Sequence, residues 1–168
     1  MLYGRAKVMD IKVHKNFMDP LLFSKLKETI TGAYFPWFKS RIVKQTDDIQ
    51  LIHTFFEFGR VNSEFFELLD PCIRFLKMKK LIRAKVNLVL RADKIKEHGY
   101  HVDTDGYKEF RSALLYVNSN NGYTRFEKKN KKIKSEENKL IDFNGYLQHT
   151  STTCTDASYR MVINFVYL

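Results

Sequence analysis

Hydrophobic residues recur at helical spacing in two stretches of the first half of the chain. The first stretch covers residues 20–30 and begins with Asp19 and Pro20, a pair that commonly starts a helix. The second runs from Ser63, a good N-cap residue, to residue 76, and Pro71 is expected to kink or divide it. The pattern therefore predicts two helices before residue 80, the second of them interrupted.

Alternation of apolar and polar residues replaces the helical pattern from about residue 81. Residues 82–91 alternate with period two, which is typical of a strand whose two faces meet different surroundings. Turn-forming residues separate the segments that follow, and the dipeptide Asn144-Gly145 favours a hairpin. Strands are therefore expected at 51–58, 82–91, 112–117, 123–127, 139–143, 146–148 and 159–167.

Helices followed by a long run of strands indicate a mostly β protein with N-terminal helices packed on one side of a β core. A jelly roll or a related barrel is the expected core. The length of 168 residues is typical of a single domain. Within it, residues 1–80 are expected to form the helical support and the first strands, and residues 81–168 the core.

The composition fits a folded protein, because 44% hydrophobic and 29% charged residues exclude a disordered or collagen-like chain. Two cysteines, Cys72 and Cys154, are too few for a disulfide scaffold. No run approaches 18 consecutive apolar residues, and residues 1–13 contain no apolar region of a signal peptide. We therefore expect a cytoplasmic protein with no membrane partner.

The net charge of +10 points to a possible anionic partner. Lysine and arginine concentrate in residues 74–96 and 128–134. These segments are either solvated faces, with 128–134 a loop between two strands, or surfaces that recognise an anionic molecule such as nucleic acid. The charge alone leaves both interpretations open.

Three residues form a candidate metal site. In a strand, residues i and i+2 project from the same face, so His101 and Asp103 can reach one metal ion. Such a pair is common by chance and needs a third ligand, for which His149 is the candidate. Two histidines and one carboxylate form the facial triad of non-haem Fe(II) sites, which leaves coordination positions open.

Three further residues are candidates for the surroundings of this site. Arg160 could hold a carboxylate with its guanidinium, or it could form an ordinary salt bridge. Tyr116 could add a phenolic hydroxyl to the same carboxylate, or it could be a core tyrosine. Asn87 either lines the pocket or satisfies backbone groups in the sheet.

The order of short motifs in the second half resembles a known family. His101-x-Asp103 is followed by the segments LLYVN (114–118), GYTRFE (122–127) and DF (142–143), then by His149, and finally by Arg160 with INF (163–165). This order resembles the 2-oxoglutarate- and Fe(II)-dependent oxygenases, and most closely the compact viral and bacterial members of the prolyl-4-hydroxylase-like branch. The resemblance covers residues 81–168.

The resemblance implies a double-stranded β-helix, a jelly-roll or cupin-like core, with iron held by His101, Asp103 and His149. It implies that Arg160 pairs with the C5 carboxylate of the co-substrate 2-oxoglutarate and that Tyr116 matches a tyrosine of the family. In the family, O₂ oxidises 2-oxoglutarate to succinate and CO₂ while the substrate is hydroxylated. Gly122-Tyr123 departs from the Gly-Gly that is usual there.

The resulting expectation is a dioxygenase that hydroxylates an unactivated carbon, with a prolyl or other side chain of a protein or peptide as the first candidate substrate. The alternatives are a nucleobase or nucleotide, a small metabolite, a cupin-like metalloprotein that does not use 2-oxoglutarate, and a non-catalytic basic jelly roll that binds nucleic acid. The lysine-rich composition would fit a virus, in which case the location would be the host cytoplasm.

Overall fold

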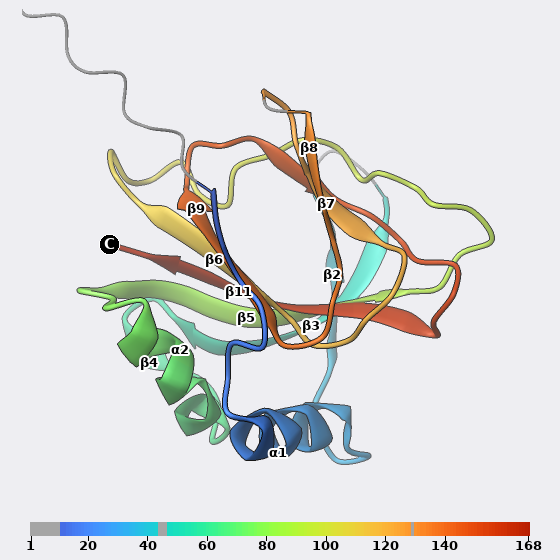
Figure 1. Cartoon of the computed structure of the whole chain (residues 1–168). Helices are drawn as coiled ribbons and strands as arrows, with labels where there is room; N and C mark the ends of the chain where they lie inside the picture. Colours follow the sequence, from blue (N-terminus) through green and yellow to red (C-terminus); the bar gives the residue numbers. More distant parts are fainter. Residues whose placement is uncertain (1–10, 44–46, 129) are drawn as a thin grey trace, which may run out of the picture.

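The computed structural model describes residues 11–43, 47–128 and 130–168 (Figure 1). In chain order the elements are β1 (Ile11–His14), α1 (Pro20–Thr31), β2 (Phe38–Arg41), β3 (Ile49–Glu57), β4 (Arg60–Val61), the 3-10 helix η1 (Phe66–Leu69), α2 (Asp70–Phe75), β5 (Leu81–Leu90), β6 (Arg111–Tyr116), β7 (Tyr123–Phe126), β8 (Lys131–Lys134), β9 (Lys139–Asn144), β10 (His149–Ser151) and β11 (Tyr159–Tyr167).

Two antiparallel sheets face each other across an interior. In the described ranges, the larger sheet has the order β1-β9-β6-β11-β5-β3-β2, with β4 paired to β3, and the smaller one has the order β10-β7-β8. Phe126 of β7 and Ile133 of β8 pack with Tyr116 and Phe143 of the large sheet in one buried cluster. Helices α1 and α2 lie on the opposite side of the large sheet (Figure 1). The prediction of a mostly β protein is confirmed.

Helix α1 begins where the sequence predicts. The Asp19 carboxylate accepts hydrogen bonds from the backbone N–H groups of Leu21 (2.9 Å) and Leu22 (3.3 Å), and Pro20 opens the helix. These N–H groups have no partner inside the helix, so the cap satisfies them. The helix buries Phe23, Leu26 and Ile30, which pack in the cluster that covers the large sheet.

The second predicted helix is divided, as expected from Pro71. The segment consists of η1 followed by α2, and Pro71 lies in the first turn of α2. Its ring removes one backbone donor, so the chain changes from 3-10 to α geometry just before it. Ser63 lies ahead of both helices, where its hydroxyl accepts from the Phe65 N–H at 3.2 Å.

Strand β11 lies between β5 and β6, and its successive side chains point alternately to the two faces of the sheet. Met161, Ile163 and Phe165 belong to the cluster beneath the helices, whereas Arg160 and Asn164 line a pocket between the sheets. The pairing is antiparallel on both sides. The period of two in the sequence therefore corresponds to a physical difference between the faces.

One strand prediction and one hairpin prediction are wrong. The strand expected at 146–148 is part of a turn, and the next strand, β10, begins at His149. Asn144-Gly145 forms a corner between the two sheets, since β9 and β10 lie in different sheets. Phe110 covers this corner so closely that a Cβ on Gly145 would overlap its ring. The turn therefore leads the chain from one sheet to the other beneath Phe110 and does not close a hairpin.

The short strands β1, β2, β4 and β8 have no counterpart among the sequence-based expectations. Strand β1 pairs with β9, β2 and β4 pair with β3, and β8 lies within the basic segment 128–134, which was expected to be a loop. In that segment residue 129 lies outside the described part. Residues 1–13 were expected to contain no apolar region of a signal peptide. Residues 1–10 of that segment also lie outside the described part. None of the helices in the described ranges has the length and apolar character needed to cross a bilayer.

The difference in burial between Ile163 of β11 and Ile49 of β3 predicts that their substitution by alanine has very different effects on stability. Ile163 has 0% exposure and Ile49, in β3, has 53%. We expect Ile163→Ala to lower the free energy of unfolding by about 2–5 kcal/mol, because it leaves a cavity in the core. Ile49→Ala should change it by less than about 0.5 kcal/mol. Urea titration followed by circular dichroism measures both, and equal effects would contradict the assignment of faces.

Candidate metal centre and adjoining pocket

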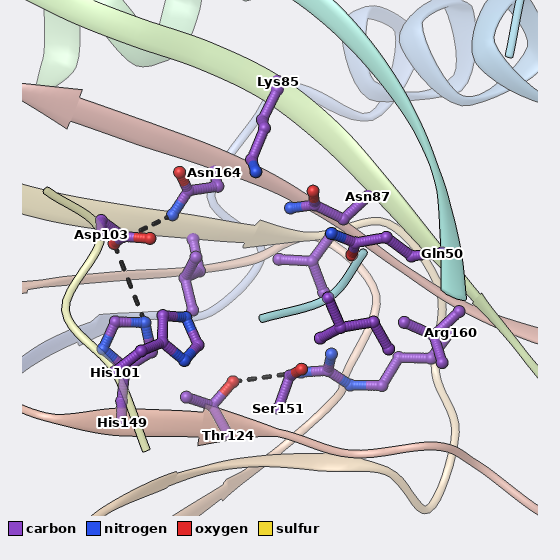
Figure 2. A pocket seen from close by; sticks show the side chains of 14 residues that line it. Gln50, Lys85, Asn87, His101, Asp103, Thr124, His149, Ser151, Arg160 and Asn164 are labelled. Carbon is purple, nitrogen blue, oxygen red and sulfur yellow. Dashed lines mark hydrogen bonds and ion pairs between the residues drawn. The ribbon is translucent and has the colours of Figure 1, made fainter. Parts of the chain in front are cut away.

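His101, Asp103 and His149 come together at one end of the interior (Figure 2). One ligand atom from each lies within 4.8 Å of the other two, and Asp103 Oδ2 is 3.8 Å from His149 Nε2. Their separation in sequence is bridged by pairing between the segment that follows β5 and strand β10. The three residues that the sequence singled out as metal ligands therefore share one site.

The backbones of the two histidines hold each other. The His101 N–H donates to the His149 carbonyl and the His149 N–H donates to the His101 carbonyl, both at 3.0 Å. This pair is an isolated bridge, and Asp103 lies in a bend beyond it. The expectation that His101 and Asp103 lie on a regular strand is therefore wrong, although their side chains still converge.

Both imidazoles are oriented for metal binding by backbone carbonyls. His101 Nδ1 lies 3.2 Å from the Gly99 carbonyl oxygen, and His149 Nδ1 lies 3.0 Å from that of Leu147. A carbonyl only accepts, so Nδ1 carries the proton and Nε2 keeps its lone pair. This tautomer presents Nε2 as a ligand, and the donor set of two nitrogens and one carboxylate suits Fe(II).

The Asp103 carboxylate is fixed by three neighbours on the large sheet. Ser112 Oγ donates to Oδ2 at 2.6 Å and Asn164 Nδ2 donates to the same oxygen at 3.2 Å. Arg83 lies 3.6 Å from Oδ1 and also donates to the Asp103 backbone carbonyl at 3.2 Å. Such contacts hold a ligand in place before any metal arrives.

The charge states also suit a metal. Burial favours the neutral form of Asp103, but His149, the Ser112 hydroxyl and Arg83 favour the charged form more and hold its pKa below the usual value. Burial, followed by the neighbouring His149, lowers the pKa of His101. At neutral pH the carboxylate is therefore ionised and the His101 imidazole neutral, which are the metal-binding forms.

A pocket extends from this site along the floor of the large sheet to Arg160. The Arg160 side chain is buried, with 3% exposure; its Nε donates to Ser135 Oγ at 2.8 Å and its Nη2 to Thr124 Oγ1 at 3.0 Å. Among the described residues no carboxylate pairs with it. Burial lowers the pKa of Arg160, and a buried cation held by hydroxyls alone is an uncompensated charge. The pocket therefore favours an anion at this end.

Tyr116 lies behind Arg160 and not in the lining of the pocket. Its hydroxyl donates to Thr124 Oγ1 at 2.9 Å, and its ring lies 5.6 Å from Arg160 Cζ. Burial raises the pKa of Tyr116, so the phenol is neutral and can donate. Asn87 does line the pocket, and its buried Oδ1 has no hydrogen-bond partner among the described residues.

Sequence reasoning missed several polar residues of the pocket. Lys85 of β5 and Asn164 of β11 lie on its floor, Gln50 of β3 lies beside them, and Thr124 forms part of the facing wall. The signal was present for two of them, because Lys85 and Asn164 are polar residues in strands whose alternate positions are apolar. What the sequence lacks is the register that sets them opposite each other.

The contacts of Asp103 predict that the Ser112 hydroxyl, which is not itself a ligand, affects how tightly the site binds a metal. We expect Ser112→Ala to weaken Co(II) binding about tenfold, because the carboxylate loses its shortest hydrogen bond. Co(II) absorption measures the binding. Ser24→Ala, on the exposed face of α1, is the matched control. Equal affinities for the two variants would show that Ser112 does not orient the ligand.

Comparison with known proteins finds likeness in structure rather than in sequence. The sequence matches no family model and no curated protein. The viral collagen prolyl hydroxylase of Paramecium Bursaria Chlorella virus-1, in complex with 2-oxoglutarate, is 12% identical, with a TM-score of 0.66 over 98% of both chains.

Two further solved structures have higher TM-scores. A prolyl hydroxylase from Trichoplax adhaerens, in complex with a hypoxia-inducible factor peptide, is 12% identical and has a TM-score of 0.71 over 96% of this chain and 84% of the other. A 2-oxoglutarate–Fe(II) oxygenase family oxidoreductase from Burkholderia pseudomallei is 12% identical and has a TM-score of 0.70, over 94% and 84%. The chain therefore shares the fold of the 2-oxoglutarate- and Fe(II)-dependent oxygenases, as the order of its motifs predicts.

Proposed function

We propose that this protein is an Fe(II)- and 2-oxoglutarate-dependent dioxygenase that hydroxylates an unactivated carbon. One observation carries the proposal: a set of two imidazoles and one carboxylate shares a pocket with a buried guanidinium that has no anionic partner in the described structure. The first group suits iron and the second suits a carboxylate at a fixed distance from it. We further propose that the facing sheets form a double-stranded β-helix and that the chain is one domain.

Each site residue has a defined role in this proposal. His101, Asp103 and His149 would hold the iron and leave coordination positions open, and Arg160 would bind the C5 carboxylate of 2-oxoglutarate. When bound, iron with O₂ and 2-oxoglutarate supplies the oxidising power, and succinate and CO₂ are the other products.

The remaining polar groups would orient the co-substrate. Thr124 Oγ1 accepts from both Tyr116 and Arg160, so the phenol fixes the hydroxyl on which the guanidinium rests. Tyr116 would therefore act as a positioning residue behind Arg160. The free Oδ1 of Asn87 points to a donor within the pocket as its partner. The Asn87 amide would accept from the bound molecule or from a water beside it.

A side chain of a protein or peptide is the proposed substrate. The similar prolyl hydroxylase from Trichoplax adhaerens is in complex with a peptide. In this chain a groove bordered by Arg41, Tyr100 and Gln148 reaches the metal ligands His101 and Asp103, so a segment bound in it would lie beside the metal site. The nucleic-acid alternative receives less support, because the basic segment 74–96 includes the buried strand residues Ala84 and Val86 and is not one continuous surface.

The central test is an anaerobic titration of metal-free protein with Fe(II) and then 2-oxoglutarate. We expect a weak visible charge-transfer band when both are present, because the oxo acid would chelate iron held by the triad. His149→Ala should abolish the band and lower Fe(II) affinity by at least about tenfold. His14→Ala, in the edge strand β1, is the control and should keep both.

Absence of the band in the parent protein, together with no saturable Fe(II) binding, would refute the oxygenase proposal. Iron binding without a response to 2-oxoglutarate would instead favour the cupin-like metalloprotein.

Arg160→Ala separates co-substrate binding from metal binding. We expect 2-oxoglutarate to bind about 10–100-fold more weakly, because a buried charged hydrogen-bond donor is lost, while Fe(II) affinity stays at the parent value. Calorimetric titration of the Zn(II)-loaded protein measures the first and Fe(II) titration the second. Arg60→Ala, on the exposed strand β4, should change neither. Unchanged 2-oxoglutarate affinity in Arg160→Ala would remove this residue from the site.

A further inference from the structure

Lys85 lies at the junction between the inner pocket and the outer groove. It projects from β5, directly opposite Asn164 of β11, and lines both spaces. Figure 2 shows its side chain reaching toward the space between Asn164 and Asn87, on the same floor as the metal site. Its side chain therefore lies where the groove meets the pocket that the metal ligands also line.

Two of the other cations around this space have a carboxylate partner. Arg83 lies 3.6 Å from Asp103 and Arg41 lies 3.3 Å from Asp47, whereas Arg160 donates only to the hydroxyls of Ser135 and Thr124. The ammonium of Lys85 has no hydrogen bond or ion pair with the described residues. A partly buried ammonium without partners is unfavourable unless something that binds in the pocket supplies them.

The charge of Lys85 persists despite its surroundings. Burial, followed by the positive charge of Arg83, lowers its pKa to about 8, so the amine is still largely protonated at pH 7. The carboxylates of Asp103 and Glu57 favour the charged form through space. Neither forms an ion pair with Lys85 in the described structure, and Asp103 is engaged by Ser112, Asn164 and Arg83. A divalent metal would add positive charge nearby and increase the need for an anion.

Lys85 and Arg160 project into the pocket from separate positions along β5 and β11. Lys85 pairs with Asn164, which is four residues from Arg160 on β11, about 13 Å at the rise of a strand. Arg160 lies at the inner end of the pocket and Lys85 at the end next to the groove. A carboxylate held at Lys85 would therefore be a second one, distinct from the carboxylate at Arg160.

We propose that Lys85 is the receptor for a second carboxylate, held beside the metal ligands at the junction of pocket and groove. The inference deepens the proposed function and rests on it, because that carboxylate belongs either to the oxo-acid end of 2-oxoglutarate or to an acidic group of the substrate. Either way, the residue determines which molecules react: it requires a carboxylate close to the reacting centre.

The test observes Lys85 itself. Protein labelled with ¹³Cε-lysine and loaded with Zn(II), which does not react with O₂, is titrated with acetate and with 2-oxoglutarate while the lysine resonances are recorded. Lys85→Arg identifies the Lys85 resonance by its disappearance. We expect this resonance to shift with at least one of the two carboxylates, and the resonance of Lys131, exposed on β8, to stay in place.

The two sources of the carboxylate give different results. If Lys85 binds the oxo-acid end of the co-substrate, 2-oxoglutarate shifts its resonance and prevents any further shift by acetate. In that case Lys85→Met weakens 2-oxoglutarate binding about tenfold, which Lys85→Arg partly restores. If it binds the substrate, acetate still shifts the resonance with 2-oxoglutarate bound, and Lys85→Met leaves 2-oxoglutarate affinity unchanged.

A resonance that responds to neither carboxylate would overturn the proposal. This result differs from a failure of the proposed function, in which 2-oxoglutarate does not bind to the metal-loaded parent at all while acetate still shifts Lys85. Lys131→Met is the matched control for loss of a lysine charge and should keep the parent affinity for 2-oxoglutarate. If it weakened binding as much as Lys85→Met does, the effect would be one of net charge.

Discussion

The register of β11 is the constraint on which the rest of the structure depends. The strand is paired on both sides, and its alternate side chains meet either the cluster beneath the helices or the polar pocket. A slip by one residue would exchange the two sets. Arg160 and Asn164 would enter the hydrophobic cluster, and Met161 and Ile163 would fill the pocket. The packing of the helices and the chemistry of the pocket are therefore fixed by the same pairing.

Electrostatics gives the interior its selectivity. Cations at both ends of the pocket, Arg160 within and Lys85 at the groove, enclose a space whose carboxylate, Asp103, is already engaged. The buried side chains of Tyr116 and Phe126 pack beside the inner end, and charge interactions are stronger in such apolar surroundings than in water. In the folded protein these two cations thus have no ion pair with a carboxylate of the described residues. Binding an anion would supply this ion pair, because the cations are in place before the anion arrives.

Local chemistry could be predicted from the sequence, and long-range register could not. His101 and Asp103 were found from their spacing and His149 from its residue type, and the structure brings all three together. The argument that used a regular strand was wrong, because a single bridge to His149 does the positioning instead. Lys85 was missed for the opposite reason: its polarity is visible in the sequence, but only pairing with β11 places it in the pocket.

The mutual backbone hydrogen bonds of His101 and His149 have a consequence for the lifetime of the protein. They help to hold the segment between β5 and β6 against β10, together with the hydrogen bonds of His98 N–H to the Ser151 carbonyl and of Thr153 N–H to the Lys96 carbonyl. A metal held by both side chains binds only the anchored form, so it stabilises that form by a free energy that grows with the logarithm of metal concentration. Exchange of the backbone amides and cleavage by proteases in this segment then depend on metal supply. A chain deprived of metal would therefore be cut around His101 more readily than the metal-loaded chain.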